Sequence, residues 1–318
     1  MAPPTLSVIL PNYNHARYLS AALRAILNQS VPPTEVIVID DASTDNSMEV
    51  IREFAKKHSV IRIYQNEKNQ GVIYGLNRGI ELAKGDYVIT TSADDEILPG
   101  LFERSLNLLA RYPQAALSCT VCRWSYVDSG LTWHMGTGMA DEPRYLSPDD
   151  LVRIGRRGKL FIGTSSAIMR KQPLIDVGGF IPDLRWHCDW FAVTVPAFRH
   201  GICFVSEPLS EFNIHSRSYY SSGRKRGEHR QVLLKLVELL NSPACADVRA
   251  RVRDSGALSL FAMPMLRILM SRPEYRPLIN ATLLRLTFRR SAELVGKTVL
   301  PRRLARWILN LFYGGPKS

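Results

Sequence analysis

The first half of the chain alternates short apolar runs with amphipathic stretches. The apolar runs are continuous, which is typical of strands that are buried on both faces of a parallel sheet. Strands are expected at residues 6–10, 36–39, 61–64, 87–91 and 115–122. Between them, apolar residues recur at helical spacing, most clearly over 72–84 and 101–112, and Gly85 suits the C-terminal cap of the first of these helices.

Repeated strand–helix units of this length predict an α/β fold, with a mainly parallel sheet and helices on both faces. The second part is less regular. A capping box at Ser147 opens a helix, 163–170 reads as a strand, and Gly178-Gly179-Phe180 marks a turn. Further elements are expected as a helix at Cys188–His200, a strand at 202–205 that runs on toward 212–215, and helices from Gln231 to the end. We therefore expect a catalytic domain over 1–225 and a helical C-terminal extension over 226–318.

Composition and charge narrow the class of protein. With 46% hydrophobic and 22% charged residues, the chain is an ordinary globular one. The formal net charge of +12 is concentrated in the tail. After residue 284 there are eight basic residues, the last of them Lys317, and one acidic residue, Glu293. This segment contains no reading motif for nucleic acid, so no nucleic-acid partner is expected. The pair Cys119 and Cys122 lies in an apolar run, which favours buried thiols over a metal or redox site.

No signal peptide and no transmembrane helix are visible, and we expect a cytoplasmic protein that is soluble or peripheral on the inner face of a membrane. The tail could supply the peripheral contact. Its apolar residues fall on one helical face, and arginines lie on the other side or its flank: Leu304, Trp307, Ile308, Leu311 and Phe312 against Arg302, Arg303 and Arg306. Such a helix suits an anionic bilayer surface, or it packs its apolar face on the catalytic domain.

Three polar clusters follow predicted strands: Asn12–Asn14, Asp40-Asp41 and Asp94-Asp95. Ligands of parallel sheets bind beyond the carboxyl ends of the strands, so we expect these clusters to converge on one site. Paired carboxylates there suit Mg²⁺ or Mn²⁺, which can bridge to a diphosphate and neutralise it as a leaving group. The alternative for both aspartate pairs is a solvated turn or helix cap.

Three single residues are weaker candidates. Tyr13 could stack on a nucleobase or be a packed surface aromatic. Asp189, among aromatic neighbours at a helix start, could act as a general base or reflect the preference of helix N-termini for negative charge. His215 could be functional, structural or solvated. Neither the G-x-G-x-x-G nor the G-x-x-x-x-G-K-[ST] motif occurs, which argues against nicotinamide dehydrogenases and P-loop enzymes.

Four ordered motifs carry a resemblance to a known family. Residues 6–14 (LSVILPNYN) and 35–45 (EVIVIDDASTD) resemble the first two strands and their loops in family 2 glycosyltransferases, which have the GT-A fold. Asn69-Gln70-Gly71 with Asn77-Arg78-Gly79-Ile80, and 83–95 (AKGDYVITTSADD), are similar to the third helix and the D-x-D-type metal motif of that family. The resemblance covers about residues 5–215.

This resemblance implies an inverting transfer of one sugar from a nucleotide diphosphate sugar to an acceptor hydroxyl. The nucleotide site would include Pro11, Asn12, Tyr13, Asp41 and Asp94, and Asp95 and His215 would hold Mn²⁺ or Mg²⁺. Asp189 would be the catalytic base, although Cys188 stands where relatives usually have Glu, and Gly178, Gly179 and Phe180 would lie on the acceptor side. The Q-x-x-R-W motif of processive synthases is missing.

The resemblance further implies a donor that is UDP-linked more often than GDP- or dTDP-linked, and a glycan or lipid-linked acceptor in cell-surface glycan synthesis. Three other functions compete. One is an inactive nucleotide-sugar-binding or scaffolding protein of the same fold, which the joint presence of Asp41, Asp95 and Asp189 argues against. A sugar nucleotidyltransferase would need a Gly-rich loop after the first strand, where 11–17 has no glycine. A nucleic-acid binder rests on the charge alone.

Overall fold

The computed structural model describes residues 4–128, 130–214 and 226–299. The strands are β1 (Leu6–Asn12), β2 (Glu35–Asp40), β3 (Ile61–Gln65), β4 (Tyr87–Thr90), β5 (Glu96–Ile97), β6 (Leu117–Tyr126), β7 (Leu131–Met135), β8 (Arg144–Leu146), β9 (Ile168–Arg170) and β10 (Ile202–Ile214). The α-helices are α1 (Ala16–Leu27), α2 (Ser47–Lys57), α3 (Val72–Leu82), α4 (Leu101–Arg111), α5 (Pro148–Arg156), α6 (Lys171–Asp176), α7 (Cys188–His200), α9 (Arg226–Asn241), α10 (Ala246–Ser255), α11 (Ala262–Ser271) and α12 (Ala281–Val299). Short 3₁₀ helices are η1 (Thr164–Ser166), η2 (Pro182–His187), η3 (Pro243–Cys245), η4 (Ala257–Phe261) and η5 (Pro273–Leu278).

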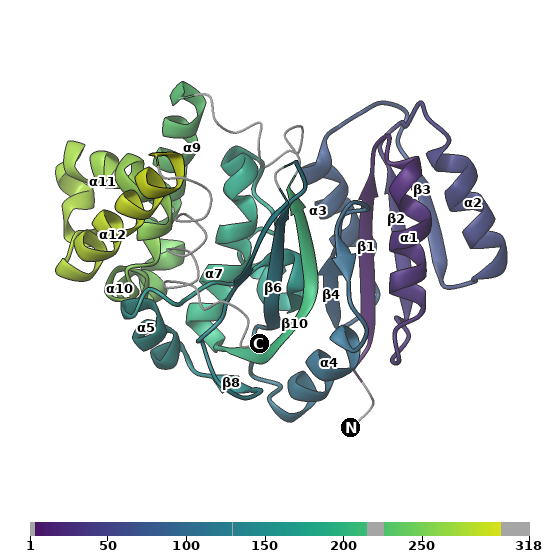
Figure 1. Cartoon of the computed structure of the whole chain (residues 1–318), viewed down its shortest axis with the longest axis horizontal. Coiled ribbons are helices and arrows are strands. Elements are labelled where there is room, and N and C mark those ends of the chain that lie inside the picture. Colours follow the sequence, from purple (N-terminus) through teal and green to yellow (C-terminus); the bar gives the residue numbers. More distant parts are fainter. Residues whose placement is uncertain (1–3, 129, 215–225, 300–318) are drawn as a thin grey trace.

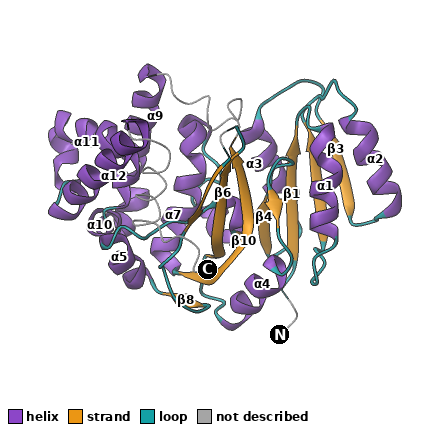
Figure 2. Ribbon diagram, viewed as in Figure 1, coloured by secondary structure: helices purple, strands orange, loops and turns teal. Residues whose placement is uncertain are grey.

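One mixed sheet runs through the molecule in the order β3-β2-β1-β4-β9-β6-β10-β5, with β7 on β6 and β8 on β10. Strands β3, β2, β1 and β4 are parallel, β9 is antiparallel to both its neighbours, and β6 pairs in parallel with β10. The predicted α/β class, with a mainly parallel sheet and helices on both faces, is confirmed (Figure 2).

Alternation along the strands explains the two-sided core. In β1, Leu6, Val8 and Leu10 face the cluster that α1, α2 and α4 complete, whereas Ile9 faces the cluster that α3 and α7 complete. Both faces are apolar because both are covered by helices, and this produces the continuous runs seen in the sequence.

The C-terminal helices continue the second of these clusters. Leu236 of α9, Val248 of α10 and Leu283 of α12 belong to the same core cluster as Ile9 and Phe198. Figure 1 shows α9 to α12 stacked at one end of the molecule, beyond α5 and α7. The expected domain boundary falls beside residues 215–225, outside the described residues, and stays a prediction. No helix in the described ranges is both long and apolar enough to span a bilayer.

Two local expectations are corrected. The expected strand at 163–170 contains the 3₁₀ turn η1, and only Ile168–Arg170 pairs with neighbouring strands. Gly85 is not a helix cap: α3 ends at Leu82, and a Cβ at Gly85 would lie 2.7 Å from the Ser7 backbone nitrogen, so this position requires glycine for close approach to β1.

The long strand β10 has an irregularity that matters for the site. Val205 pairs with Thr120 and Ser210 pairs with Cys122, so β10 advances five positions while β6 advances two. Such a bulge bends the strand and re-aims the side chains beyond it. The last part of β10 therefore reaches the ends of the parallel strands as a separate segment, and it carries Glu211–Asn213 with it.

The cysteines behave as the apolar context predicts. Cys119 and Cys122 are free thiols buried in β6. Burial raises the pKa of the Cys122 thiol to about 11, which leaves it protonated and unreactive at neutral pH.

Candidate active site

The polar clusters that follow β1 and β2 meet at one edge of the sheet. The Asn12 side-chain amide donates to Asp40 Oδ1 at 2.8 Å and to Ser43 Oγ at 3.1 Å. Asn14 Oδ1 accepts from the Thr44 backbone nitrogen at 2.8 Å. These bonds join the two loops, and they assign the fully buried Asp40 a structural role.

Asp45 connects the same two loops to the helices that follow them. Its two carboxylate oxygens accept from the backbone nitrogens of Ala16 and Ser47, each at 3.0 Å. These are the first residues of α1 and α2, so one side chain caps two helices and satisfies donors that the helices leave free.

Asp41 organises the next loop of the site. Its Oδ1 accepts from Asn66 Nδ2 at 2.8 Å and the Gln70 backbone nitrogen at 2.9 Å, and its Oδ2 accepts from the Gly71 backbone nitrogen at 2.8 Å. A carboxylate has about four acceptor positions, so three are used within the protein. One position on Oδ2 is left for a ligand.

A hollow of about 370 Å³ opens beside Asp41, and its lining residues are Ala42, Ser43, Gln65, Asn66 and Glu67. It lies where β2 and β3 end, at the side of the sheet where an α/β fold binds its ligand. Tyr13, directly after β1, has 44% of its surface exposed, and Pro11 lies over α3 at Gly75. Four of the five residues that line the hollow are polar.

The acidic pair Asp94-Asp95 follows β4 and is held by the end of β10. The Asn213 backbone nitrogen donates to Asp95 Oδ1 at 3.0 Å, and the Asn213 side-chain amide donates to the Asp94 carbonyl at 2.8 Å. Burial, together with the charges of Asp94 and Glu211, raises the pKa of Asp95 well above its usual range. A carboxylate placed among other carboxylates in this way is stabilised by a bound cation.

Side chains alone do not complete a metal site within the described ranges, where no group of three or more His, Cys, Asp or Glu is arranged to hold an ion. His215, the other expected ligand, lies outside the described residues. Mg²⁺ and Mn²⁺ are commonly held by one or two carboxylates with the rest of the shell supplied by water and phosphate oxygens. Asp94 and Asp95 fit that mode.

Asp189, at the start of α7, is a further, half-buried carboxylate of this region. Burial raises the pKa of Asp189, although hydrogen bonds from the Trp190 backbone nitrogen and from Thr164 Oγ1, at 2.6 and 3.3 Å, act in the opposite direction. A carboxylate with a raised pKa is a better proton acceptor near neutral pH than an exposed one.

The turn η1 lies between the two carboxylate groups. Its Thr164 hydroxyl contacts Asp189, and its Ser165 hydroxyl lies 3.8 Å from the Cys122 thiol. That thiol lies near Asp95, because the negative charge of Asp95 raises the pKa of the thiol. Thr164, Ser165 and Asn213 were not anticipated, because nothing local in the sequence marks a lone Ser, Thr or Asn as facing a site.

The turn Gly178-Gly179-Phe180 is locked to α3. Asn77 Oδ1 accepts from the Phe180 backbone nitrogen at 2.9 Å, and Asn77 Nδ2 donates to the Phe180 carbonyl at 2.8 Å. Both glycines have positive φ, and the Phe180 side chain is 1% exposed in the core. The turn therefore sets the path of the chain from α6 to η2 and Asp189, and only its backbone is available to a ligand.

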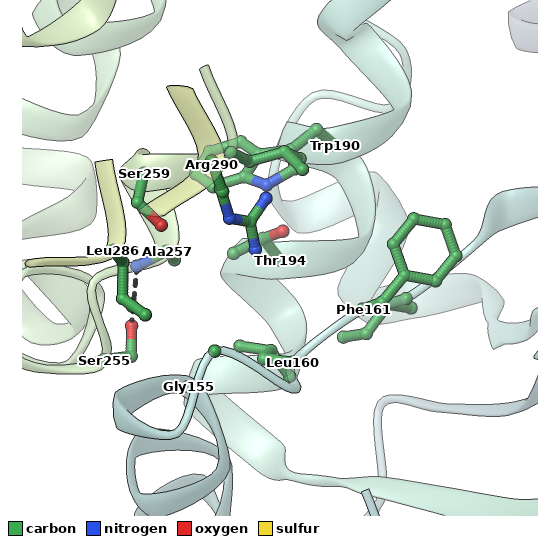
Figure 3. Close-up of a pocket in the computed structure, with 13 residues that line it drawn as sticks. Gly155, Leu160, Phe161, Trp190, Thr194, Ser255, Ala257, Ser259, Leu286 and Arg290 are labelled. Atoms are coloured by element: carbon green, nitrogen blue, oxygen red, sulfur yellow. Dashed lines mark hydrogen bonds between the residues drawn. The ribbon is translucent and has the colours of Figure 1, made fainter. Parts of the chain in front are cut away.

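A cavity of about 50 Å³ lies on the far side of Asp189, between α7 and the C-terminal helices (Figure 3). Trp190 and Thr194 line it from α7, and Leu286 and Arg290 line it from α12.

Comparisons with known proteins agree with this fold. The family profile described as Glycosyl transferase family 2 matches residues 7–178. The chain therefore belongs to family 2 of the glycosyltransferases, as the sequence motifs indicated.

Individual relatives have modest identity. The uncharacterized glycosyltransferase YibD of Escherichia coli is 25% identical over 74% of this chain and 70% of its own length. The putative teichuronic acid biosynthesis glycosyltransferase TuaG of Bacillus subtilis is 24% identical over 75% of this chain and 90% of its own.

Solved structures share the fold. S. aureus TarS 1–349 in complex with UDP-GlcNAc superposes with a TM-score of 0.64 at 17% identity, over 97% of this chain and 90% of that one. The mannosyltransferase PcManGT of Pyrobaculum calidifontis, in complex with GDP-Man and Mn²⁺, gives 0.57 at 18% identity, over 98% and 86%. The mixed sheet and the helical C-terminal region match these GT-A glycosyltransferases.

Proposed function

We propose that the protein transfers one sugar from a nucleotide diphosphate sugar to an acceptor hydroxyl, with inversion at the anomeric carbon. The observation that carries this proposal is the pair of half-buried carboxylates, Asp95 and Asp189, on either side of η1. One belongs to an acidic cluster suited to a cation, and the other stands apart from that cluster as a proton acceptor. A single displacement needs both, one for the leaving group and one for the attacking hydroxyl.

Asp94 and Asp95 would hold Mn²⁺ or Mg²⁺ together with the donor diphosphate and His215. The ion, when bound, neutralises charge on the leaving diphosphate as a Lewis acid. The chain's own contribution is to fix the acidic pair: Asn213 holds both residues through its backbone and its side chain. The Mn²⁺ in the PcManGT complex supports the choice of ion.

The nucleotide would lie across the ends of β1 and β2, with the base in the hollow beside Asp41. Asp41 would accept one further N–H on Oδ2, Tyr13 would offer its exposed ring for stacking, and Pro11 and Asn12 would contribute to the nucleotide site. A uridine nucleotide is our choice on the family resemblance alone, because the ring N–H groups of uracil, thymine and guanine can all donate to a carboxylate. TarS, which binds UDP-GlcNAc, supports this choice, whereas PcManGT, which binds GDP-Man, supports guanine instead. The identity of the base is therefore tested directly below.

The acceptor hydroxyl would approach between η1 and α7, where Asp189 takes its proton as the C–O bond forms. The backbone of Gly178-Gly179-Phe180 positions the segment that carries this base. By analogy with TuaG, whose name refers to teichuronic acid biosynthesis, we place the reaction in cell-surface glycan synthesis at the cytoplasmic side of a membrane.

Two measurements test the donor side. Treatment with EDTA should abolish release of UDP from UDP-sugars, and Mn²⁺ or Mg²⁺ should restore it, whereas Asp95→Ala should be folded and inactive. Calorimetry with UDP, GDP and dTDP should rank UDP first. Full turnover by Asp95→Ala in EDTA would overturn the metal role, and tighter binding of GDP or dTDP would overturn the choice of base.

The tail helix at 300–318, outside the described residues, is proposed as the contact with an anionic membrane. Liposome flotation with full-length protein and with a chain ending at residue 299 tests it. We expect only the full-length protein to float with vesicles that contain anionic lipid, and equal recovery of both chains in the aqueous fraction would overturn the proposal.

A further inference from the structure

The cavity between α7 and the C-terminal helices contains a polar side chain that its surroundings leave unsatisfied. Ser259 of η4 is 1% exposed, it lines the cavity, and its hydroxyl has no hydrogen-bond partner within the described part of the chain. Ser255 also lines the cavity, but its hydroxyl donates to the Val252 carbonyl at 3.0 Å and accepts from the Ala257 backbone nitrogen at 3.2 Å. Almost every buried polar group of a folded protein is hydrogen-bonded, so the Ser259 hydroxyl indicates an occupant of the cavity.

An unsatisfied hydroxyl does not make a site by itself. Ser105 of α4 and Ser118 of β6 are also fully buried and lack a partner in the described ranges, but neither lines this cavity. Ser259 differs from them because it faces a space that other polar side chains share.

The polar side chains around this space are hydrogen-bond donors. Arg290 lines the cavity from α12, and Trp190 and Thr194 line it from α7, where they are one helical turn apart. Figure 3 shows the Arg290 guanidinium and the side chains of Ser259 and Thr194 turned toward the middle of the cavity. A guanidinium and an indole N–H only donate, and hydroxyls can donate. These donors suit an occupant that is rich in acceptor oxygens.

The charge around the cavity is positive. Arg290 is charged, and no acidic residue occurs among the described residues that line the cavity. A second guanidinium lies close by, since a Cβ at Gly158, which also lines the cavity, would lie 3.3 Å from an Arg289 nitrogen. Asp254 of α10 forms an ion pair with Arg253 at 2.7 Å, which offsets its charge. An anion is therefore favoured over a neutral or cationic occupant.

We propose that this cavity is a binding site for a phosphate group, which the Arg290 guanidinium and the hydroxyls of Ser259 and Thr194 hold. A guanidinium forms strong paired hydrogen bonds with phosphate oxygens. The tetrahedral oxygens of phosphate can meet donors from η4, α7 and α12 at the same time, whereas the two oxygens of a carboxylate lie in one plane. The site is separate from the proposed nucleotide, metal and base positions, and it does not depend on the proposed function.

A phosphate group in this cavity links two parts of the molecule. Ser259 and Arg290 belong to the C-terminal helices, whereas Trp190 and Thr194 belong to the helix that begins beside Asp189. The bound group therefore joins the C-terminal helices to α7, and it stabilises the folded protein, because a ligand that binds only the folded state raises its stability.

The test is calorimetric titration of inorganic phosphate into the full-length protein, in EDTA and without nucleotide, together with thermal unfolding. We expect one saturable site and a higher Tm in phosphate. Loss of one hydrogen bond to a charged ligand should raise the phosphate Kd roughly 10- to 100-fold in Ser259→Ala and in Arg290→Gln. Ser259→Ala removes a hydroxyl that no described group bonds, so this variant should fold as wild type does without phosphate. Ser105→Ala is the matched control and should keep the wild-type Kd.

Two further arms locate the site and identify the source of the phosphate group. Phosphate should bind to Asp95→Ala as it does to wild type, and UDP should not displace it, because the diphosphate of a nucleotide would bind elsewhere. Dihexanoyl phosphatidic acid carries the same group on a lipid. Tighter binding of this lipid than of inorganic phosphate would identify a lipid headgroup as the source, and equal or weaker binding would identify free phosphate.

Four results would overturn the site. The first is that no saturable phosphate binding is found, in which case ordered water alone satisfies Ser259. The second is an unchanged phosphate Kd in Ser259→Ala. The third is loss of phosphate binding in Asp95→Ala or its displacement by UDP, which would place the phosphate at the strand ends. The fourth is tighter binding of acetate than of phosphate, which would make the ligand a carboxylate.

Discussion

Replacing Asp189 by asparagine removes one charge and changes almost nothing else. Asparagine has the same shape, and its Oδ1 can still accept from the Trp190 backbone nitrogen, the 2.6 Å bond that orients the side chain. Its Nδ2 can donate to Thr164 Oγ1, which is 3.3 Å from the carboxylate. The variant should therefore fold with the geometry of the site preserved, while the proton acceptor is lost.

The size of the effect follows from what a base contributes. A positioned general base accelerates reactions by about 10²- to 10⁴-fold. That corresponds to roughly 2.7–5.4 kcal/mol of barrier, at 1.36 kcal/mol per factor of ten. Because partial burial raises the pKa of Asp189, it is a stronger base than an exposed aspartate, so we expect a loss in the upper part of this range. Donor affinity should change little, since the nucleotide site is formed by other strands.

The assay is the initial rate of UDP release at saturating donor and acceptor, with donor Kd from calorimetry. Asp183→Asn is the matched control, because Asp183 is six positions away, its side chain is 69% exposed, and its only described ion pair is a 3.5 Å contact with Lys235. That control should keep wild-type kcat. The reasoning would be refuted if Asp189→Asn retained near wild-type kcat, or if it lost donor binding together with turnover.

Three further outcomes are expected. Thr164→Val removes a hydrogen bond that lowers the pKa of Asp189, so the acid limb of the kcat/KM profile should move to higher pH, and an unmoved limb would contradict the assignment of Asp189 as the base. Asp95 binds its proton more tightly in the folded protein, so stability falls as pH rises through its raised pKa; Asp95→Asn should therefore raise the metal-free Tm at neutral pH by about 1–4 °C and leave it unchanged at low pH, as checked by calorimetry. A Cβ at Gly79 would lie 2.2 Å from Ile9 Cγ2, so Gly79→Ala should cost about 1–3 kcal/mol in urea unfolding, and a smaller loss would mean that α3 can shift off β1.

The features that could be predicted from the sequence are those that depend on neighbouring residues along the chain. The strand ends at Asn12, Asp40 and Thr90 could be located because continuous apolar runs stop abruptly at polar residues. Their convergence followed from the parallel arrangement alone. The capping box at Ser147 and the helix at Cys188–His200 are equally local features, and the structure confirms both.

What could not be predicted depends on long-range pairing. Asn213 lies 118 positions from Asp95, and its place beside the acidic pair depends on the bulge in β10. The turn η1 was expected as a strand because its apolar flanks resemble one, and only packing against α7 and β6 decides otherwise. The ring contacts of Trp124 with Trp133 and Phe212 likewise form only when β6, β7 and β10 are in register.

The bulge in β10 also limits how the length of this segment can vary during evolution. Side chains of a strand alternate between its two faces, so the deletion of one residue between Val205 and Ser210 would exchange the faces of every residue that follows. Asn213 would move to the former position of Phe212 and turn away from the acidic pair, and Ile214 would take its place, in a protein that still folds. Insertions and deletions in this stretch are therefore expected in steps of two residues, which restore the phase of the strand.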